Sequence, residues 1–195
     1  NWAMPLDELW DDALKAYADQ GFAKRPADEV KKDLAEFFGL RLKNLLQENG
    51  IRYDVIDAVL SADLTVVPAV LAKAKALMAA VAEDEFKLVV EQFNRVHNLA
   101  QKAEADKVDE ALFAEAAERD LYQAYLAVSR EVDGMADQEK VLAALATLRQ
   151  PINVFFDQVM VMADDPAVRG NRLGLLLRLS RLIFAYADFS KLVFA

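Results

Sequence analysis

One stretch of the sequence, 83–102, combines helical spacing with side chains that suit RNA. Its polar face places four residues at positions i, i+4, i+7 and i+11: Glu91, Arg95, Asn98 and Lys102. Arg95 suits a phosphate, and Asn98 with its neighbour Asn94 suits the edges of unpaired bases. A polar stripe of this kind is more often only the solvated face of a helix, so both interpretations stay open.

A second polar set lies near the end of the chain, in an expected helix over 165–186. Helical periodicity puts Arg178 and Arg181 on one face with Gly174 and Ala185, where no large apolar side chain lies. Both arginines are therefore expected to be exposed, as part of a solvated face or of a phosphate-binding patch. The candidates for RNA binding are then Asn94, Arg95, Asn98, Arg178 and Arg181.

Arg172, on the same helix, has a different environment. It projects among apolar residues of the expected core: Leu176, Leu179 and Ile183. A guanidinium group among apolar side chains needs a carboxylate partner. We therefore interpret Arg172 as structural and expect its ion-pair partner among three aspartates that precede it: Asp157, Asp164 and Asp165.

The sequence predicts no catalytic residue, no metal ligand and no cofactor for this chain. It has no cysteine and one histidine, which excludes thiolate zinc sites, cysteine catalysis and two-histidine metal sites. No glycine-rich phosphate loop is present. Asp164 and Asp165, just before Pro166, fit a helix cap better than an acid/base pair. His97 follows Phe93 by four positions, and we interpret it as partly buried and hydrogen-bonded rather than catalytic or RNA-stacking.

Charge and hydropathy limit the partners. The formal net charge of −9 opposes non-specific binding to a polyanion, so any contact with RNA must use local basic groups. DNA is not an expected partner. No apolar run approaches the ~20 residues that a membrane helix needs. The expected location is therefore the cytoplasm, without a membrane partner.

Apolar residues recur with a period close to 3.6 along nearly the whole chain, which predicts an all-α fold. We expect a bundle of about eight to nine helices, over 6–20, 28–48, 53–60, 65–81, 83–102, 109–132, 137–150, 151–162 and 165–186. Residues 103–108 are small or polar and indicate a surface connection. The segment 151–162 is rich in valine and phenylalanine, so a strand is the alternative there.

Two parts are expected along the chain. Residues 1–82 form a helical part that links to a missing upstream chain, since the sequence opens with Asn1-Trp2 rather than methionine. Residues 83–195 form the second helical bundle.

Several runs carry a family resemblance. The run 151–165 reads PINVFFDQVMVMADD and is followed by Asn171-Arg172-Leu173, and 187–192 reads ADFSKL. Upstream, 50–59 reads GIRYDVIDAV, and Asn94-Arg95-Val96 follows it. These motifs, in this order and over most of the chain, resemble the C-terminal part of the beta subunit of bacterial glycyl-tRNA synthetases.

The resemblance implies that 83–195 is an anticodon-binding domain of the DALR type. In that family the alpha subunit activates glycine with ATP and magnesium, while the beta subunit recognises tRNA and completes an alpha2beta2 enzyme. The implied partners are glycine tRNA and the alpha subunit, and this chain alone is expected to be non-catalytic. His97 stands where the family pattern leads us to expect a smaller polar residue. The alternative is a helical interaction domain that supports subunit assembly without touching RNA.

Overall fold

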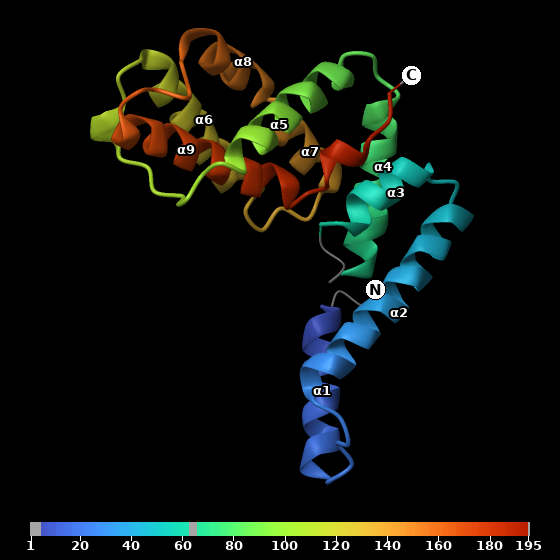
Figure 1. The fold of residues 1–195 in the computed structure, drawn as a ribbon. Coiled ribbons are helices and arrows are strands. Elements are labelled where there is room, and N and C mark those ends of the chain that lie inside the picture. The colour runs from blue at the N-terminus through green and yellow to red at the C-terminus, as the bar shows by residue number, and fades with distance from the viewer. Residues whose placement is uncertain (1–4, 63–65, 195) are drawn as a thin grey trace.

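The computed structural model describes residues 5–62 and 66–194, and every regular element within them is helical (Figure 1). The α-helices are α1 (Leu6–Asp19), α2 (Ala27–Glu48), α3 (Tyr53–Leu60), α4 (Val67–Val81), α5 (Phe86–Ala100), α6 (Ala116–Val132), α7 (Gln138–Ala146), α8 (Arg149–Gln158) and α9 (Pro166–Phe184). Two short 3₁₀ helices are η1 (Glu110–Leu112) and η2 (Phe189–Lys191). The all-α prediction is confirmed. Asn1, Trp2 and the expected helix start at residue 65 lie outside the described residues.

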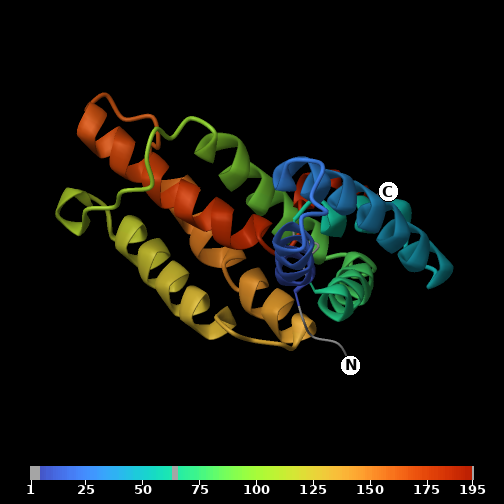
Figure 2. The same ribbon diagram turned by 90° about the horizontal axis from the view of Figure 1, so that it is seen from below.

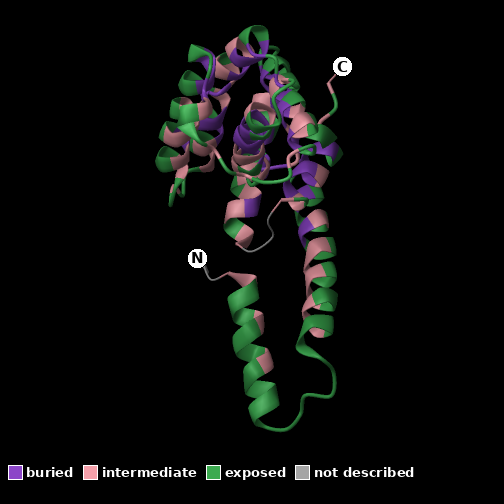
Figure 3. Ribbon diagram, turned by 60° about the vertical axis from the view of Figure 1, so that its left-hand side comes forward, coloured by how far each residue is buried: buried purple, intermediate pink, exposed green. Residues whose placement is uncertain are grey.

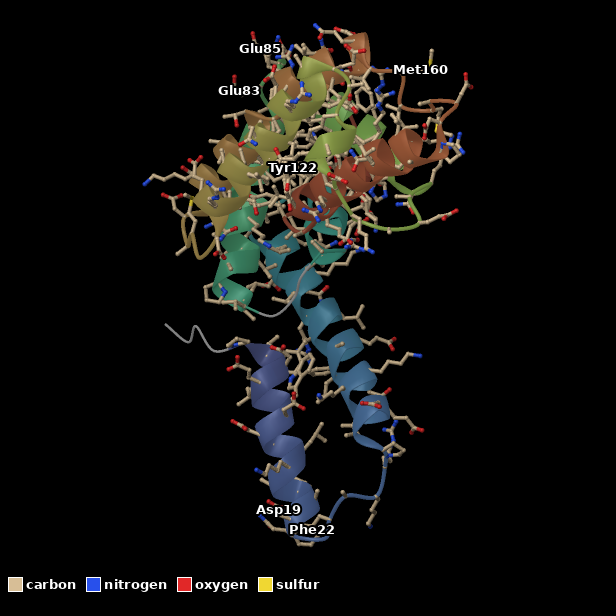
Figure 4. The ribbon with its side chains drawn as sticks, turned by 90° about the vertical axis from the view of Figure 1, so that its left-hand side faces the viewer. Asp19, Phe22, Glu83, Glu85, Tyr122 and Met160 are labelled. Atoms are coloured by element: carbon tan, nitrogen blue, oxygen red, sulfur yellow. The ribbon has the colours of Figure 1, made fainter. Side chains whose placement is uncertain are left out.

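Helices α1 and α2 form a hairpin that projects from a bundle made by α3 to α9 (Figure 1). No residue of α1 is buried, and the hairpin is coloured mostly as exposed or intermediate in Figure 3. Its tip, where Figure 4 labels Asp19 and Phe22, lies far from the bundle. The two helices meet through Trp10 and Phe38, whose ring centroids are 5.6 Å apart.

The core of the bundle is centred on α9, which packs most extensively against α5 (Figure 2). The leucines of α9 point inward, and Leu175, Leu176 and Leu179 are fully buried. Phe93 of α5 and Phe189 of η2 are also fully buried, with ring centroids 5.1 Å apart. Side chains of α3 and α4 join the same core, so α3 to α9 share one apolar interior. The division at 82/83 stays a prediction.

The helix signals in the sequence act largely as expected. Asp165 caps α9, because its carboxylate accepts hydrogen bonds from the N–H groups of Ala167, at 2.7 Å, and Val168, at 3.2 Å. The strand alternative for 151–162 is wrong, because Pro151 stands in the first turn of helix α8. This helix ends at Gln158, earlier than expected, and Val159 has an extended backbone.

Arg172 is buried as predicted, but the predicted partners are wrong. Its carboxylate partner is Glu118 of α6: Nε of Arg172 donates to Oε1 at 2.9 Å and Nη2 to Oε2 at 3.3 Å. A third N–H donates to the carbonyl oxygen of Met160, in the α8–α9 connection labelled in Figure 4. The three predicted aspartates make other contacts. Asp165 caps α9, and the carboxylate of Asp157 accepts a hydrogen bond from the side chain of Asn153. Asp164 accepts from Arg169 only through its backbone oxygen.

Glu118 links α6 to α9 and to the residues just before α6. Its side chain also accepts the backbone N–H groups of Ala114 and Glu115, which closes a capping box at the start of α6. Burial raises the pKa of the Glu118 carboxyl, but the hydrogen bonds from Arg172 and from these N–H groups outweigh it and hold the pKa below its ordinary value. The carboxylate is therefore ionised and fully satisfied inside the bundle.

A second buried carboxylate ties the end of the chain to α3. Asp54 is buried and accepts from Nε of Arg52 at 2.6 Å and from the N–H of Val193 at 2.8 Å. Burial raises the pKa of Asp54, and these hydrogen bonds together lower it below its ordinary value. Arg52 is thereby a structural residue of the α3 end of the bundle.

Candidate nucleic-acid interface

The outer face of α5 carries two of the predicted residues in the expected way. The helix buries an apolar face against the core: Phe86, Val89, Val90, Phe93, Val96 and Ala100. Arg95 and Asn98 stand on the opposite side and are exposed. Neither forms a hydrogen bond or an ion pair within the described part of the chain, so their polar groups are free to bind another molecule.

Arg95 is held by an aromatic ring rather than by a carboxylate. Its guanidinium carbon lies 4.0 Å from the ring centroid of Phe156, a buried residue of α8. A guanidinium over an aromatic face is attracted by the negative face of the ring, and its N–H groups stay available at the edge. The contact therefore holds the guanidinium of Arg95 against α8 without neutralising its charge.

Asn94 is less accessible than its neighbours. It is half-buried, and its Oδ1 atom is enclosed and lacks a hydrogen-bond partner among the described residues. A base can reach this oxygen only if neighbouring side chains move. Its role in RNA binding stays a prediction, as do those of Arg95 and Asn98.

His97 is partly buried and hydrogen-bonded, as the sequence predicts. One ring nitrogen, Nδ1, lies 2.9 Å from Oγ of Ser180, and Nε2 lies 3.1 Å from the side-chain nitrogen of Gln101. The ring stacks on Phe184 of α9 with centroids 4.0 Å apart. The hydrogen bond to Ser180 and the stacking on Phe184 thus join α5 to α9, while the contact with Gln101 stays at the end of α5.

The face of α9 that carries Arg178 and Arg181 is only partly exposed, because the connection between α5 and η1 crosses it. Nε of Arg178 donates to the carbonyl oxygen of Asp106 at 2.6 Å, and Arg178 is half-buried. The prediction that Arg178 is exposed is therefore wrong. Arg181 is exposed as predicted, but it pairs with the carboxylate of Asp106. We call residues 101–109 the crossing loop.

Gly174 and Asn171 fix the crossing loop on the same face of α9. A Cβ atom on Gly174 would lie 2.3 Å from the carbonyl oxygen of Lys107, so only glycine lets the loop approach this closely. The side chain of Asn171 accepts the N–H of Asp109 at 2.7 Å and donates to its carbonyl oxygen at 3.0 Å. The loop is held by the helix at successive turns.

The crossing loop and the first half of α9 enclose a groove of about 680 Å³. Its apolar lining includes Val108 of the crossing loop and Leu173 of α9, and Gly170 also lines it from α9. Four basic residues also line it: Lys102, Lys107, Arg169 and Arg178. Glu104 and Asp109 contribute two carboxylates, so positive groups outnumber negative ones.

The structure brings the predicted residues into two sets rather than one surface. Arg95 lies against α8, whereas Arg178 and Arg181 of α9 both contact Asp106 of the crossing loop. Sequence analysis missed the groove, because a loop expected only to connect two helices forms one of its walls. The sequence feature that could have indicated the groove is Gly174, a glycine inside a helix and on the same face as Arg178 and Arg181.

Across residues 5–62 and 66–194, no group of three or more histidine, cysteine or carboxylate side chains is arranged to hold a metal ion. No helix in these two ranges combines the length and the apolar character that crossing a bilayer requires.

Comparisons with known proteins place these elements in a family. Residues 89–185, from α5 to the end of α9, match the DALR anticodon binding domain. The chain is 40% identical over 195 residues to the glycine–tRNA ligase beta subunit of Halalkalibacterium halodurans and 43% identical over 200 residues to that of Shouchella clausii. The corresponding subunit of Clostridioides difficile is 40% identical.

Each of these matches covers 98% of this chain but 28% of the relative, so the chain spans somewhat more than a quarter of the length of these proteins. The matched domain contains α5, the crossing loop, the groove and α9. The chain belongs to the glycine–tRNA ligase beta subunit family, and residues 89–185 form its DALR anticodon binding domain.

Proposed function

We propose that this chain binds the anticodon arm of glycine tRNA, as the tRNA-recognition part of an enzyme that joins glycine to its tRNA. The observation that carries the proposal is the match of 89–185 to an anticodon binding domain, within relatives named glycine–tRNA ligase beta subunit. The free polar groups on α5 support it, because Arg95 and Asn98 are exposed and unpaired within the described chain.

In the enzyme, the alpha subunit and the beta subunit have different tasks, as in the family that the chain resembles. An alpha subunit performs the ATP- and magnesium-dependent activation of glycine, and the present chain contributes binding and not chemistry. The protein acts in the cytoplasm, where tRNA is charged. The absence of a catalytic constellation in the sequence, with one histidine and no cysteine, supports a binding role.

The proposed RNA surface is the outer face of α5. Arginine and asparagine pair with the edges of bases that are splayed out of a loop. Replacing Arg95 or Asn98 by alanine is expected to cost about 1–3 kcal/mol of binding free energy for glycine tRNA, and less for a tRNA whose anticodon has been exchanged.

The experiment measures the affinity of the complete beta subunit for both RNAs at several salt concentrations. Glu91→Ala, on the same face of α5, is the matched control, because it removes a negative charge that repels RNA. Its affinity is expected to equal or exceed that of the parent protein. If Arg95→Ala and Asn98→Ala bind both tRNAs as the parent does, the α5 surface is wrong.

A second function, in subunit assembly, is favoured by the α1–α2 hairpin. Four of its large apolar side chains are at least half-exposed: Tyr17, Phe22, Phe37 and Leu40. Exposed aromatic groups on one element are typical of a protein contact. Exchange of Tyr17 and Phe37 for serine is expected to weaken assembly with the alpha subunit, as measured by sedimentation, and to leave tRNA affinity unchanged.

A further inference from the structure

On its α9 side, the groove is lined by a glycine, Gly170, that the packing of the chain does not require. Gly170 lies inside helix α9, where glycine is less favourable than alanine. A Cβ atom built on Gly170 meets nothing within 4 Å, and its φ is not positive. Gly174, by contrast, is required by the carbonyl oxygen of Lys107. The missing side chain of Gly170 therefore leaves open space on this side of the groove.

The charges around the groove are also unpaired. Lys102 and Lys107 form no ion pair or hydrogen bond through their side chains in the described part of the chain, and Arg169 donates only to backbone oxygens of Ala163 and Asp164. Two carboxylates line the groove, those of Glu104 and Asp109, and Asp109 accepts the N–H of Ala111. The carboxylate of Asp106, in the same loop, is paired with Arg181. A net positive rim in a chain of net charge −9 is complementary to an anionic ligand.

The groove has the size and the apolar lining of a site for a small aromatic group. Its volume of about 680 Å³ lies within the roughly 300–1,000 Å³ that ligand sites occupy. Val108 and Leu173 belong to its apolar lining, against which a base can pack while its phosphates meet the lysines. The crossing loop is fixed to α9 by Asn171 and Arg178, so the groove exists before any ligand binds.

We propose that this groove holds one unpaired nucleotide of the anticodon loop, with its base against Val108 and Leu173 and its phosphates at Lys102 and Lys107. The proposal rests on the proposed function, because it assigns a second contact to the same RNA. Lys102 lies two residues beyond the end of α5, so a strand that crosses the outer face of α5 continues directly into the groove.

The charge test uses two double variants of the complete beta subunit. Lys102→Gln with Lys107→Gln is expected to weaken binding of glycine tRNA and to flatten its salt dependence by about 1.4 in the log–log slope, at about 0.7 for each single-strand phosphate. Lys75→Gln with Lys87→Gln is the matched control. Both residues are exposed, and Lys87 lies roughly 20 Å from Lys102 along α5.

The shape test uses Gly170. Gly170→Ala adds one methyl group in open space and is expected to bind tRNA nearly as the parent does. Gly170→Phe fills the groove and is expected to weaken binding at least tenfold. A fluorescent 2-aminopurine at one anticodon-loop position is expected to change its emission on binding to the parent and to Gly170→Ala, but not to Gly170→Phe. Thermal unfolding of each variant checks that it is folded.

The outcomes separate the groove from the proposed function. If the parent subunit binds tRNA, and the Lys102/Lys107 variant matches the Lys75/Lys87 control, the groove is not a nucleotide site. Equal tRNA affinities of the Gly170→Phe and Gly170→Ala variants would also overturn the proposed nucleotide site. If the parent subunit binds no tRNA at all, the proposed function itself fails.

Discussion

At the scale of single residues, a buried ion pair between Arg172 and Glu118 joins α9 to α6. Periodicity alone placed Arg172 among apolar side chains, and it is buried. Its partner, Glu118, is 54 positions away on another helix, and no helical pattern reports such a contact. The same limit applies to Arg178, which periodicity placed on a polar face correctly, although a loop covers that face.

The ion pair of Arg172 predicts a large effect on stability. Arg172→Ala leaves the carboxylate of Glu118 buried without its partner, which typically costs about 3–5 kcal/mol. Arg178→Ala removes one hydrogen bond to a backbone oxygen and is expected to cost about 0.5–1.5 kcal/mol. Urea unfolding of the two variants measures the difference, and equal free energies of unfolding would show that the pair is unimportant.

The same pair predicts a pH dependence with a definite sign. Because the folded protein holds the pKa of Glu118 below its ordinary value, the carboxylate stabilises the fold above a pH of about 4.3. This contribution is lost as the pH falls through the folded pKa. In Arg172→Ala the unpartnered carboxyl takes up a proton more easily. The stability difference between the parent and this variant is therefore expected to shrink below pH 4.3, and a constant difference would contradict the account.

At the scale of elements, helices were predictable and the loop that crosses α9 was not. The caps and breaks that bound helices are local, as with Asp165 and Pro166, so they can be found in the sequence. The crossing loop has few apolar side chains and is positioned by Gly174 and Asn171, which lie more than 60 residues further on. A loop of this kind is indistinguishable from a plain surface connection until its docking helix is known.

Two glycines of α9 provide a matched test of how the loop is held. Gly174→Ala would place a methyl group against the carbonyl oxygen of Lys107 and is expected to destabilise the protein by about 1–2 kcal/mol, with faster amide exchange in the crossing loop. Gly170→Ala meets no atom and is expected to stabilise the helix by about 0.5–1 kcal/mol. If both variants gain stability, the loop does not depend on close approach at Gly174.

At the scale of the whole molecule, one apolar core supports two different surfaces. The bundle presents the outer face of α5 and the groove beside it, while the α1–α2 hairpin extends away with exposed aromatic side chains (Figures 1 and 3). The overall charge of −9 keeps a general attraction to nucleic acid low, so recognition depends on a few local basic groups. The geometry favours RNA at the bundle and protein contacts at the hairpin.

Cross-linking from the anticodon loop tests the central claim most directly. Glycine tRNA with thiouridine in the anticodon loop is bound to the complete beta subunit and irradiated, and the linked peptides are identified by mass spectrometry. The account predicts links within α5 and the crossing loop, inside the DALR anticodon binding domain at 89–185. Links found only outside 89–185, on the hairpin or elsewhere in the subunit, would contradict it.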